Sequence, residues 1–180
     1  IAAQGKVSFA YTPVLLGGIF KAIGNQSPMQ TYGHIKSKRD YDTVEMRRFM
    51  ARHGITAFTM NPHFPVNTLL VMRGAVAAEQ LGCGPAYREA MYTALWQDGL
   101  KLDEPEVWAA VVTKAGLDAA ALGAAVQDDA VKAELVASTE SAVARGAFGR
   151  IAAQAARARA FGGEVDAALG AWRSGVGTLR

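Results

Sequence analysis

The chain has 180 residues, about half of them apolar, and a formal net charge of +3. Its length supports one folded domain, or one domain with an insertion, and its apolar runs fall short of the ~20 residues that a membrane-spanning helix needs. A single cysteine, Cys83, excludes an internal disulfide or a CxxC redox pair.

The first predicted element is a strand over residues 6–16. Val7, Phe9 and Tyr11 alternate with other residues before an apolar run, and Gly17-Gly18 is expected to form the turn that ends the strand. This is the one strand that the pattern supports. A lone strand leaves its backbone N–H and C=O groups unpaired, so it must have partners.

From residue 36 onward the apolar spacing becomes helical. The first helix should carry Tyr41, Val44 and Phe49 on one face and end at Gly54, whereas two prolines exclude a helix from residues 61–67. Five more helices are expected: residues 68–81 with Asn67 as N-cap, a helix opening at Pro85, one with an Asp103–Glu106 capping box that stops at Gly116, and segments capped by Asp118 and Asp128, the last stopping near Gly146.

Charge is distributed unevenly along the chain. Residues 1–149 hold 14 basic and 14 acidic side chains, so all of the net positive charge lies in residues 150–180. Basic clusters at residues 36–39 and 47–52 interleave with acidic residues at helical spacing, which favours a solvated helix face over a polyanion site. No nucleic-acid partner is therefore expected.

Few residues carry chemistry on their own. The three histidines and Cys83 lack metal-ligand spacing, so no metal site is predicted. His63 is the one histidine in a motif-like setting, but no carboxylate at a suitable spacing orients it as a general base. Cys83 lies between two glycines without a basic neighbour that would stabilise a thiolate.

Three stretches, in order, carry a resemblance to a known family: residues 11–25 (YTPVLLGGIFKAIGN), 61–68 (NPHFPVNT) and 94–99 (ALWQDG). Together they resemble the 2-hydroxychromene-2-carboxylate isomerases, which belong with the kappa-class glutathione transferases and are similar to DsbA in fold. The similarity covers roughly residues 6–149 and includes ARGAFG near its end.

The resemblance implies an α/β fold, mostly helical by content, with a thioredoxin-like core that is incomplete here and a large all-helical insertion. Residues 1–35 would form part of the core, 36–131 the insertion, 132–149 a return helix, and 150–180 an atypical tail rich in Ala, Gly and Arg. The missing partners of the strand would lie before Ile1 and after Gly149.

The implied activity is glutathione-dependent isomerisation of 2-hydroxychromene-2-carboxylate or a related intermediate of aromatic degradation. In that family the thiol of glutathione adds reversibly to the conjugated substrate and is later expelled. The family's catalytic serine would lie upstream of this chain, and Arg150 follows where the family continues into a cis-proline turn, so no catalytic residue is assigned. A kappa-like glutathione transferase and a non-catalytic fragment are alternatives, and a DsbA-like oxidoreductase would require an upstream CxxC.

Six residues are candidate ligand contacts. Lys21 and Asn25 would contact a substrate carboxylate or glutathione, or else be a surface lysine and a helix-start cap. Asn67 would hold an anion or glutathione, although simple capping is the more common role of such an asparagine. Asn61, Phe64 and Trp96 would line an aromatic pocket, while core packing explains Phe64 and Trp96 equally well.

The expected partners follow from the same resemblance. They are glutathione as cofactor, an aromatic or conjugated carboxylate as substrate, and a second copy in a homodimer. We expect a cytoplasmic protein without a membrane segment.

Overall fold

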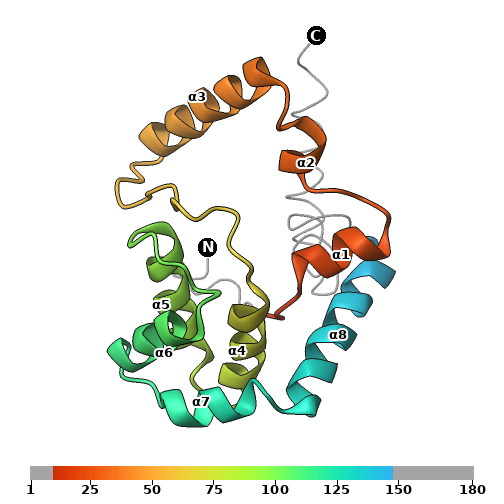
Figure 1. Cartoon of the computed structure of the whole chain (residues 1–180), viewed down its shortest axis with the longest axis vertical. Coiled ribbons are helices and arrows are strands. Elements are labelled where there is room, and N and C mark those ends of the chain that lie inside the picture. The colour runs from red at the N-terminus through yellow and green to blue at the C-terminus, as the bar shows by residue number, and fades with distance from the viewer. Residues whose placement is uncertain (1–9, 148–180) are drawn as a thin grey trace, which may run out of the picture.

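A computed structural model describes residues 10–147, which fold into eight helices (Figure 1). Over this range no residue belongs to a β-strand. No helix here is long and apolar enough to cross a membrane. The helices are α1 Leu16–Ala22, α2 Pro28–Tyr32, α3 Lys36–Arg52, α4 Leu69–Gln80, α5 Gly84–Trp96, α6 Pro105–Lys114, α7 Ala119–Ala125 and α8 Asp129–Ala144.

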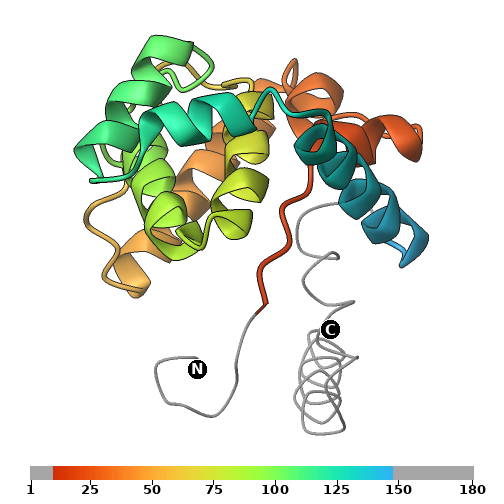
Figure 2. The same cartoon turned by 90° about the horizontal axis from the view of Figure 1, so that it is seen from below.

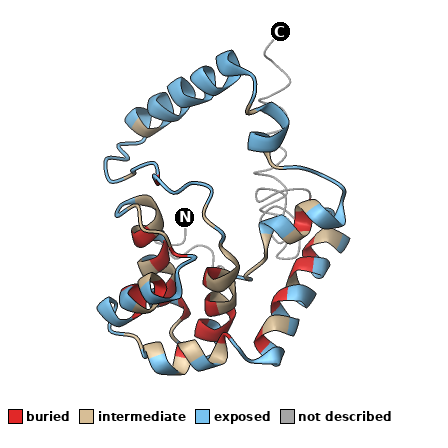
Figure 3. Ribbon diagram, viewed as in Figure 1, coloured by how far each residue is buried: buried red, intermediate tan, exposed pale blue. Residues whose placement is uncertain are grey.

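The main core lies among α4, α5, α6, α7 and the first half of α8 (Figure 3). Tyr87 and Met91 of α5, four residues apart as the helical spacing predicts, are both buried there. Each helix contributes one apolar stripe, so the five stripes close around a shared interior. Its most buried aliphatic side chains are Val76, Leu102, Val112, Leu122 and Val131.

A second, smaller cluster forms where α1 packs against α8, as Figures 1 and 2 show. Ile19 of α1 is fully buried against Ala142 of α8 and Ala147 just beyond it. Val131 and Leu135, nearer the start of α8, belong to the main core instead. The predicted boundary at residue 131 therefore falls within a continuous helix that joins the two clusters.

The predicted strand is wrong over the described part of its range, residues 10–16. Residues 10–15 form no strand, Leu16 starts α1, and Gly17 and Gly18 lie inside that helix rather than in a turn. The physical reason is that α8 supplies partners for this backbone: the Leu15 N–H donates to Thr139 Oγ1 over 3.0 Å, and Ser138 Oγ donates to the Pro13 carbonyl over 2.6 Å. Residues 6–9 lie outside the described range.

Most helix signals are confirmed. Asp118 accepts a hydrogen bond from the Ala121 N–H and Asp128 accepts one from the Ala130 N–H, so both are N-caps. Gly116 and Gly146 follow α6 and α8 with φ of 72° and 85°, a conformation that favours glycine.

The predicted capping box of α6 is wrong. The N-cap is Glu104, without a side-chain cap bond, because its carboxylate instead accepts a hydrogen bond from Lys101 Nζ over 2.8 Å. A capping box that the sequence reasoning missed forms at α2 between Ser27 and Gln30.

The helix α3 stands apart from the bundle (Figures 1 and 3). None of its 17 residues is buried, and Tyr41 and Phe49 are 60% and 58% exposed. The expectation that Tyr41, Val44 and Phe49 form a packing face is therefore not met by the described residues. Arg52 ends the helix, and Gly54 follows as predicted.

Candidate functional site

Asn61 fixes the segment between α3 and α4 onto the end of α5. Its side chain is 3% exposed, and Nδ2 donates to the carbonyls of Leu95 and Leu100 over 3.0 and 2.9 Å. Its Oδ1 accepts from the His63 N–H over 2.8 Å. Because these bonds use both amide hydrogens and the amide oxygen, Asn61 acts first as a structural clamp.

Three aromatic rings gather beside this clamp. Phe58 stacks on Trp96 with ring centroids 5.7 Å apart and an interplanar angle of 19°. The Phe64 ring lies beside Trp96 with a centroid separation of 6.2 Å and a tilt of 44°, and Phe64 is 43% exposed. The Phe64–Pro65 peptide bond is cis. Trp96 thus packs with two phenylalanines, both from the segment between α3 and α4.

A small pocket opens at this cluster. Its volume is about 70 Å³, and its lining combines residues 61–68 with the end of α5: Asn61, Phe64, Val66, Thr68, Leu95 and Trp96. Two of the three stretches that carry the resemblance therefore meet in space. Pockets that enclose whole ligands usually measure about 300–1,000 Å³, so this one accommodates part of an aromatic ring system.

The third stretch lies at α1, and neither of its candidate residues lines the pocket. Lys21, in the last turn of α1, is exposed and makes no ion pair with the described residues. Asn25 is exposed, and its Oδ1 accepts from the Gln26 N–H over 2.8 Å. A ligand role for this pair stays a prediction.

Asn67 takes the capping role in a modified form. Its Oδ1 accepts from the Leu69 N–H over 3.0 Å, while the backbone N-cap position of α4 is occupied by Thr68. The side chain is exposed at the start of α4, and a ligand contact there stays a prediction.

A buried polar network was missed by the sequence reasoning. Trp108 Nε1 donates to Tyr87 Oη over 2.8 Å, and that hydroxyl donates to the Val71 carbonyl over 3.0 Å. Burial raises the pKa of the Tyr87 phenol, and the hydrogen bond from Trp108 partly opposes this effect. The one hint in the sequence was Gly74, a glycine inside a largely apolar helix. The structure explains it, since a Cβ at Gly74 would come within 2.7 Å of Tyr87 Cζ.

Neither His63 nor Cys83 lines the pocket at Trp96. His63 is exposed, and Cys83 packs half-buried against the main core. Lys101 lowers the pKa of the neighbouring Glu104 carboxyl, with a smaller contribution from His63. In residues 10–147, no group of three or more His, Cys, Asp or Glu side chains is arranged to hold a metal ion.

Comparisons with known proteins place the chain in a family. The solved structure of a 2-hydroxychromene-2-carboxylate isomerase is similar to it, with a TM-score of 0.69, 24% identity, and 82% of this chain and 70% of that chain covered. At this identity the likeness shows the fold alone. No curated protein sequence matches the chain. A sequence profile of the DSBA-like thioredoxin domain matches residues 1–150, so the chain belongs to the DSBA-like thioredoxin domain family.

Proposed function

We propose that the chain is part of a glutathione-dependent isomerase acting on 2-hydroxychromene-2-carboxylate or a similar conjugated aromatic acid. The observation that carries this proposal is the pocket at Trp96, where residues 61–68 meet the end of α5. These are the stretches whose sequences resemble the isomerases, and the fold neighbour is one of those enzymes.

The pocket supplies flat apolar surface for a planar substrate. The Phe64 and Trp96 rings, 6.2 Å apart at a 44° tilt, offer a wedge into which the edge of an aromatic ring fits. Asn61 maintains this wedge because its bonds to Leu95 and Leu100 hold the segment that carries Phe64. Its role in turnover is to position the loop rather than to contact the reacting atoms.

The polar end of a ligand needs a cation and amide donors. Lys21 provides an exposed ammonium group. The side-chain oxygen of Asn25 accepts a hydrogen bond from the Gln26 N–H, whereas its amide hydrogens make no bond to the described residues. An ammonium group and amide donors are the kinds of group that bind a carboxylate, so we assign this pair to a carboxylate of the substrate or of glutathione. When bound, glutathione supplies the thiolate nucleophile that no cysteine of this chain is positioned to provide.

An activity assay tests the proposal. Conversion of 2-hydroxychromene-2-carboxylate is followed by its absorbance change with glutathione, with S-methylglutathione and without either. We expect turnover only with the free thiol. Lys21→Ala should raise KM for the substrate or glutathione, whereas Lys114→Ala, at an exposed lysine of α6, should change nothing.

The alternatives give different results in the same assay. Conjugation of glutathione to a generic aromatic electrophile, without isomerisation, would identify a kappa-like transferase. Absence of both reactions, together with no heat of glutathione binding at millimolar concentration, would identify a non-catalytic module and end the isomerase proposal.

A further inference from the structure

One face of α5 carries side chains that the proposed function leaves mostly unused. The opposite face of this helix is buried in the main core, where Tyr87 and Met91 lie. Residues three or four positions apart share a face of a helix, and five such residues line a groove on the side away from that core: Glu89, Tyr92, Thr93, Trp96 and Gln97. Helical spacing therefore brings two aromatic rings and a carboxylate together.

We call this feature the α5 groove. Its other wall consists of side chains from the segment between α3 and α4: Ile55, Ala57 and Phe58. The Thr59 N–H donates to the Trp96 carbonyl over 2.6 Å, which holds this wall against the helix. The groove has a volume of about 210 Å³ and shares only Trp96 with the pocket of the proposed function. Because sites for drug-sized ligands usually measure about 300–1,000 Å³, the groove suits a small molecule.

The aromatic rings of the groove favour a positively charged ligand. Phe58 stacks on Trp96 with ring centroids 5.7 Å apart, and Tyr92, one helical turn before Trp96, is 59% exposed. The face of an aromatic ring carries partial negative charge and attracts a cation placed within about 6 Å of its centre. The rings therefore select a cation over an anion.

Glu89 adds a full negative charge to the groove. It is the one charged residue of the lining, and its carboxylate makes no ion pair or hydrogen bond within the part of the chain that the structure describes. Residues 61–147 hold six Lys or Arg and eleven Asp or Glu, so the helical bundle around the groove is itself acidic. Both features attract a cationic ligand and repel an anionic one.

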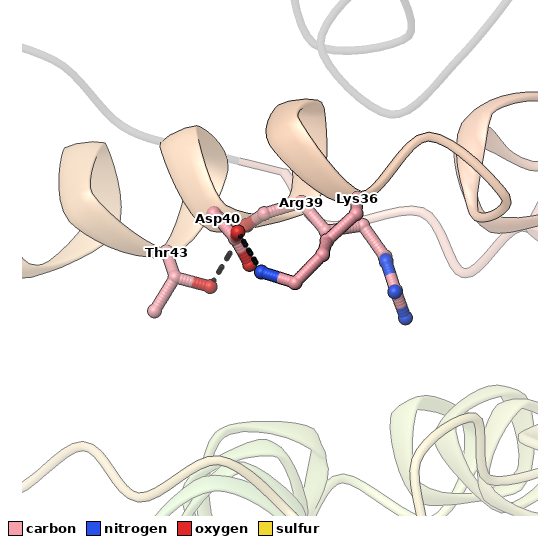
Figure 4. Close-up of polar contacts among 4 residues, drawn as sticks. All are labelled: Lys36, Arg39, Asp40 and Thr43. Atoms are coloured by element: carbon pink, nitrogen blue, oxygen red, sulfur yellow. Dashed lines mark hydrogen bonds and ion pairs between the residues drawn. The ribbon is translucent and has the colours of Figure 1, made fainter.

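Positive side chains on neighbouring elements leave Glu89 unpaired. Arg88, which precedes it on α5, pairs with Glu79 instead. On α3, Lys36 pairs with Asp40 over 2.5 Å, and Figure 4 shows both of these side chains on that helix. Because no described Lys or Arg forms an ion pair with Glu89, a ligand cation can take that position.

We propose that the α5 groove binds a small organic cation that carries a quaternary ammonium group, the chemistry of choline. The Glu89 carboxylate and the ring faces of Tyr92 and Trp96 attract its positive charge, and its methyl groups pack against the apolar wall at Ile55. A primary ammonium is more strongly hydrated and has three N–H donors to satisfy, so it loses more on entering an apolar lining. This site does not rest on the proposed function.

Titration of the isotope-labelled full chain with choline, followed by two-dimensional NMR, tests the site. We expect saturable shifts at millimolar choline for the Glu89 and Tyr92 amides and the Trp96 indole. Two further probes separate the contributions. The neutral isostere of choline, in which carbon replaces the ammonium nitrogen, tests the charge, and ethanolamine, which lacks the methyl groups, tests the quaternary centre. Each should bind roughly tenfold more weakly than choline, or weaker still.

Two variants locate the binding. Glu89→Gln removes the carboxylate charge but keeps the size of the side chain, and it should weaken choline binding roughly tenfold. Tyr92→Leu removes a ring face and should act in the same direction. Glu140→Gln on α8 and Tyr41→Leu on α3, at exposed residues of the same types, are the matched controls and should bind choline as the wild type does.

Several results would contradict the site. They are the absence of a saturable shift at millimolar choline, equal affinities for choline and its neutral isostere, ethanolamine bound as tightly as choline, and a Glu89→Gln variant with wild-type affinity. Binding to phosphatidylcholine vesicles without binding of free choline would assign the ammonium group to a lipid headgroup and overturn the proposal of a small free ligand.

Discussion

Tyr87, Trp108 and Gly74 form a contact in which each residue depends on the other two. The phenol hydroxyl bridges the Trp108 indole and the Val71 carbonyl of α4. That hydroxyl reaches α4 because Gly74 has no side chain, since a Cβ would lie 2.7 Å from Tyr87 Cζ and 3.2 Å from Trp108 Cζ2. Every buried side-chain nitrogen or oxygen in residues 10–147 has a hydrogen-bond partner, and this network is part of the reason.

The substitution Gly74→Ala tests this close approach. Overpacking at a tight contact destabilises by about 1–3 kcal/mol, which outweighs the helix-propensity gain of about 1 kcal/mol from replacing glycine. We expect the free energy of unfolding, measured by urea denaturation, to fall. Gly123→Ala in α7 is the control, because nothing lies within 4 Å of its Cβ, and it should stabilise the protein. A stabilised Gly74→Ala variant would contradict the described packing.

Raised pH should destabilise the protein through Tyr87. Because burial raises the pKa of this phenol, its contribution to stability is complete below the ordinary tyrosine pKa of about 10 and is lost as pH rises toward the folded value. The unfolding free energy of the wild type should therefore fall above that pH by up to about 1.4 kcal/mol per pH unit from this group. Tyr87→Phe should remove that slope, while Tyr92→Phe, at an exposed ring, should retain it. Parallel pH profiles for all three proteins would refute the assignment.

The clamp role of Asn61 gives a third residue-scale prediction. Asn61→Ala leaves the carbonyls of Leu95 and Leu100 and the His63 N–H without their partner, at a cost of about 1–3 kcal/mol. The change should also expose Trp96 and shift its fluorescence to longer wavelength. Asn25→Ala, at an exposed asparagine, should alter stability by less than about 0.5 kcal/mol. An Asn61→Ala variant of wild-type stability would show that the clamp has no energetic role.

Among the elements, α8 binds the backbone of residues 10–15, a role that a neighbouring strand would have in a sheet. Thr139 Oγ1 accepts from the Leu15 N–H and donates to the Leu135 carbonyl over 2.7 Å. Thr139→Val should weaken this attachment by about 1 kcal/mol and accelerate hydrogen exchange at the Leu15 amide. Thr113→Val removes only the matching bond to the Ala109 carbonyl within α6 and should leave that exchange rate unchanged. Equal exchange rates in both variants would mean that Thr139 does not hold the segment.

The same elements show how far sequence reasoning reaches. The helices from α4 to α8 were predictable because their caps, stops and apolar spacing are local signals, as Asp118 and Gly116 illustrate. The state of residues 10–15 was not predictable, because apolar alternation is compatible with any extended segment. The conformation of this segment depends on hydrogen bonds with the hydroxyl groups of Ser138 and Thr139, which lie more than 120 residues away in the sequence.

For the candidate site, the sequence identified Asn61, Phe64 and Trp96, and the structure brings them into one pocket. It could not reveal that the Asn61 amide is consumed by backbone bonds, because the partners of the amide hydrogens lie 34 and 39 residues away. Nor could it place α1, which carries Lys21 and ends three residues before Asn25, beside α8, since that packing involves two distant segments. The α/β class expected from the resemblance is not confirmed by the strand-free residues 10–147, although family membership and fold similarity are.

On the scale of the whole molecule, the proposed function requires one chain to offer both an aromatic wedge and a carboxylate-binding region. In that proposal the wedge lies where residues 61–68 meet α5, and the carboxylate-binding region lies at the end of α1, which packs against α8. Since α8 contributes to both hydrophobic clusters, it is the element that fixes these two regions relative to each other.

Ligand titration of the isotope-labelled chain, followed by two-dimensional NMR, tests the proposed ligand site most directly. On adding glutathione and then 2-hydroxychromene-2-carboxylate, we predict chemical-shift changes at the Trp96 indole, the Phe64 amide and the Lys21 and Asn25 amides. The Trp108 indole, sealed between Tyr87 and the main core, should not respond. Unchanged spectra at millimolar ligand, or shifts confined to residues away from Trp96 and α1, would contradict a glutathione-dependent isomerase site in this chain.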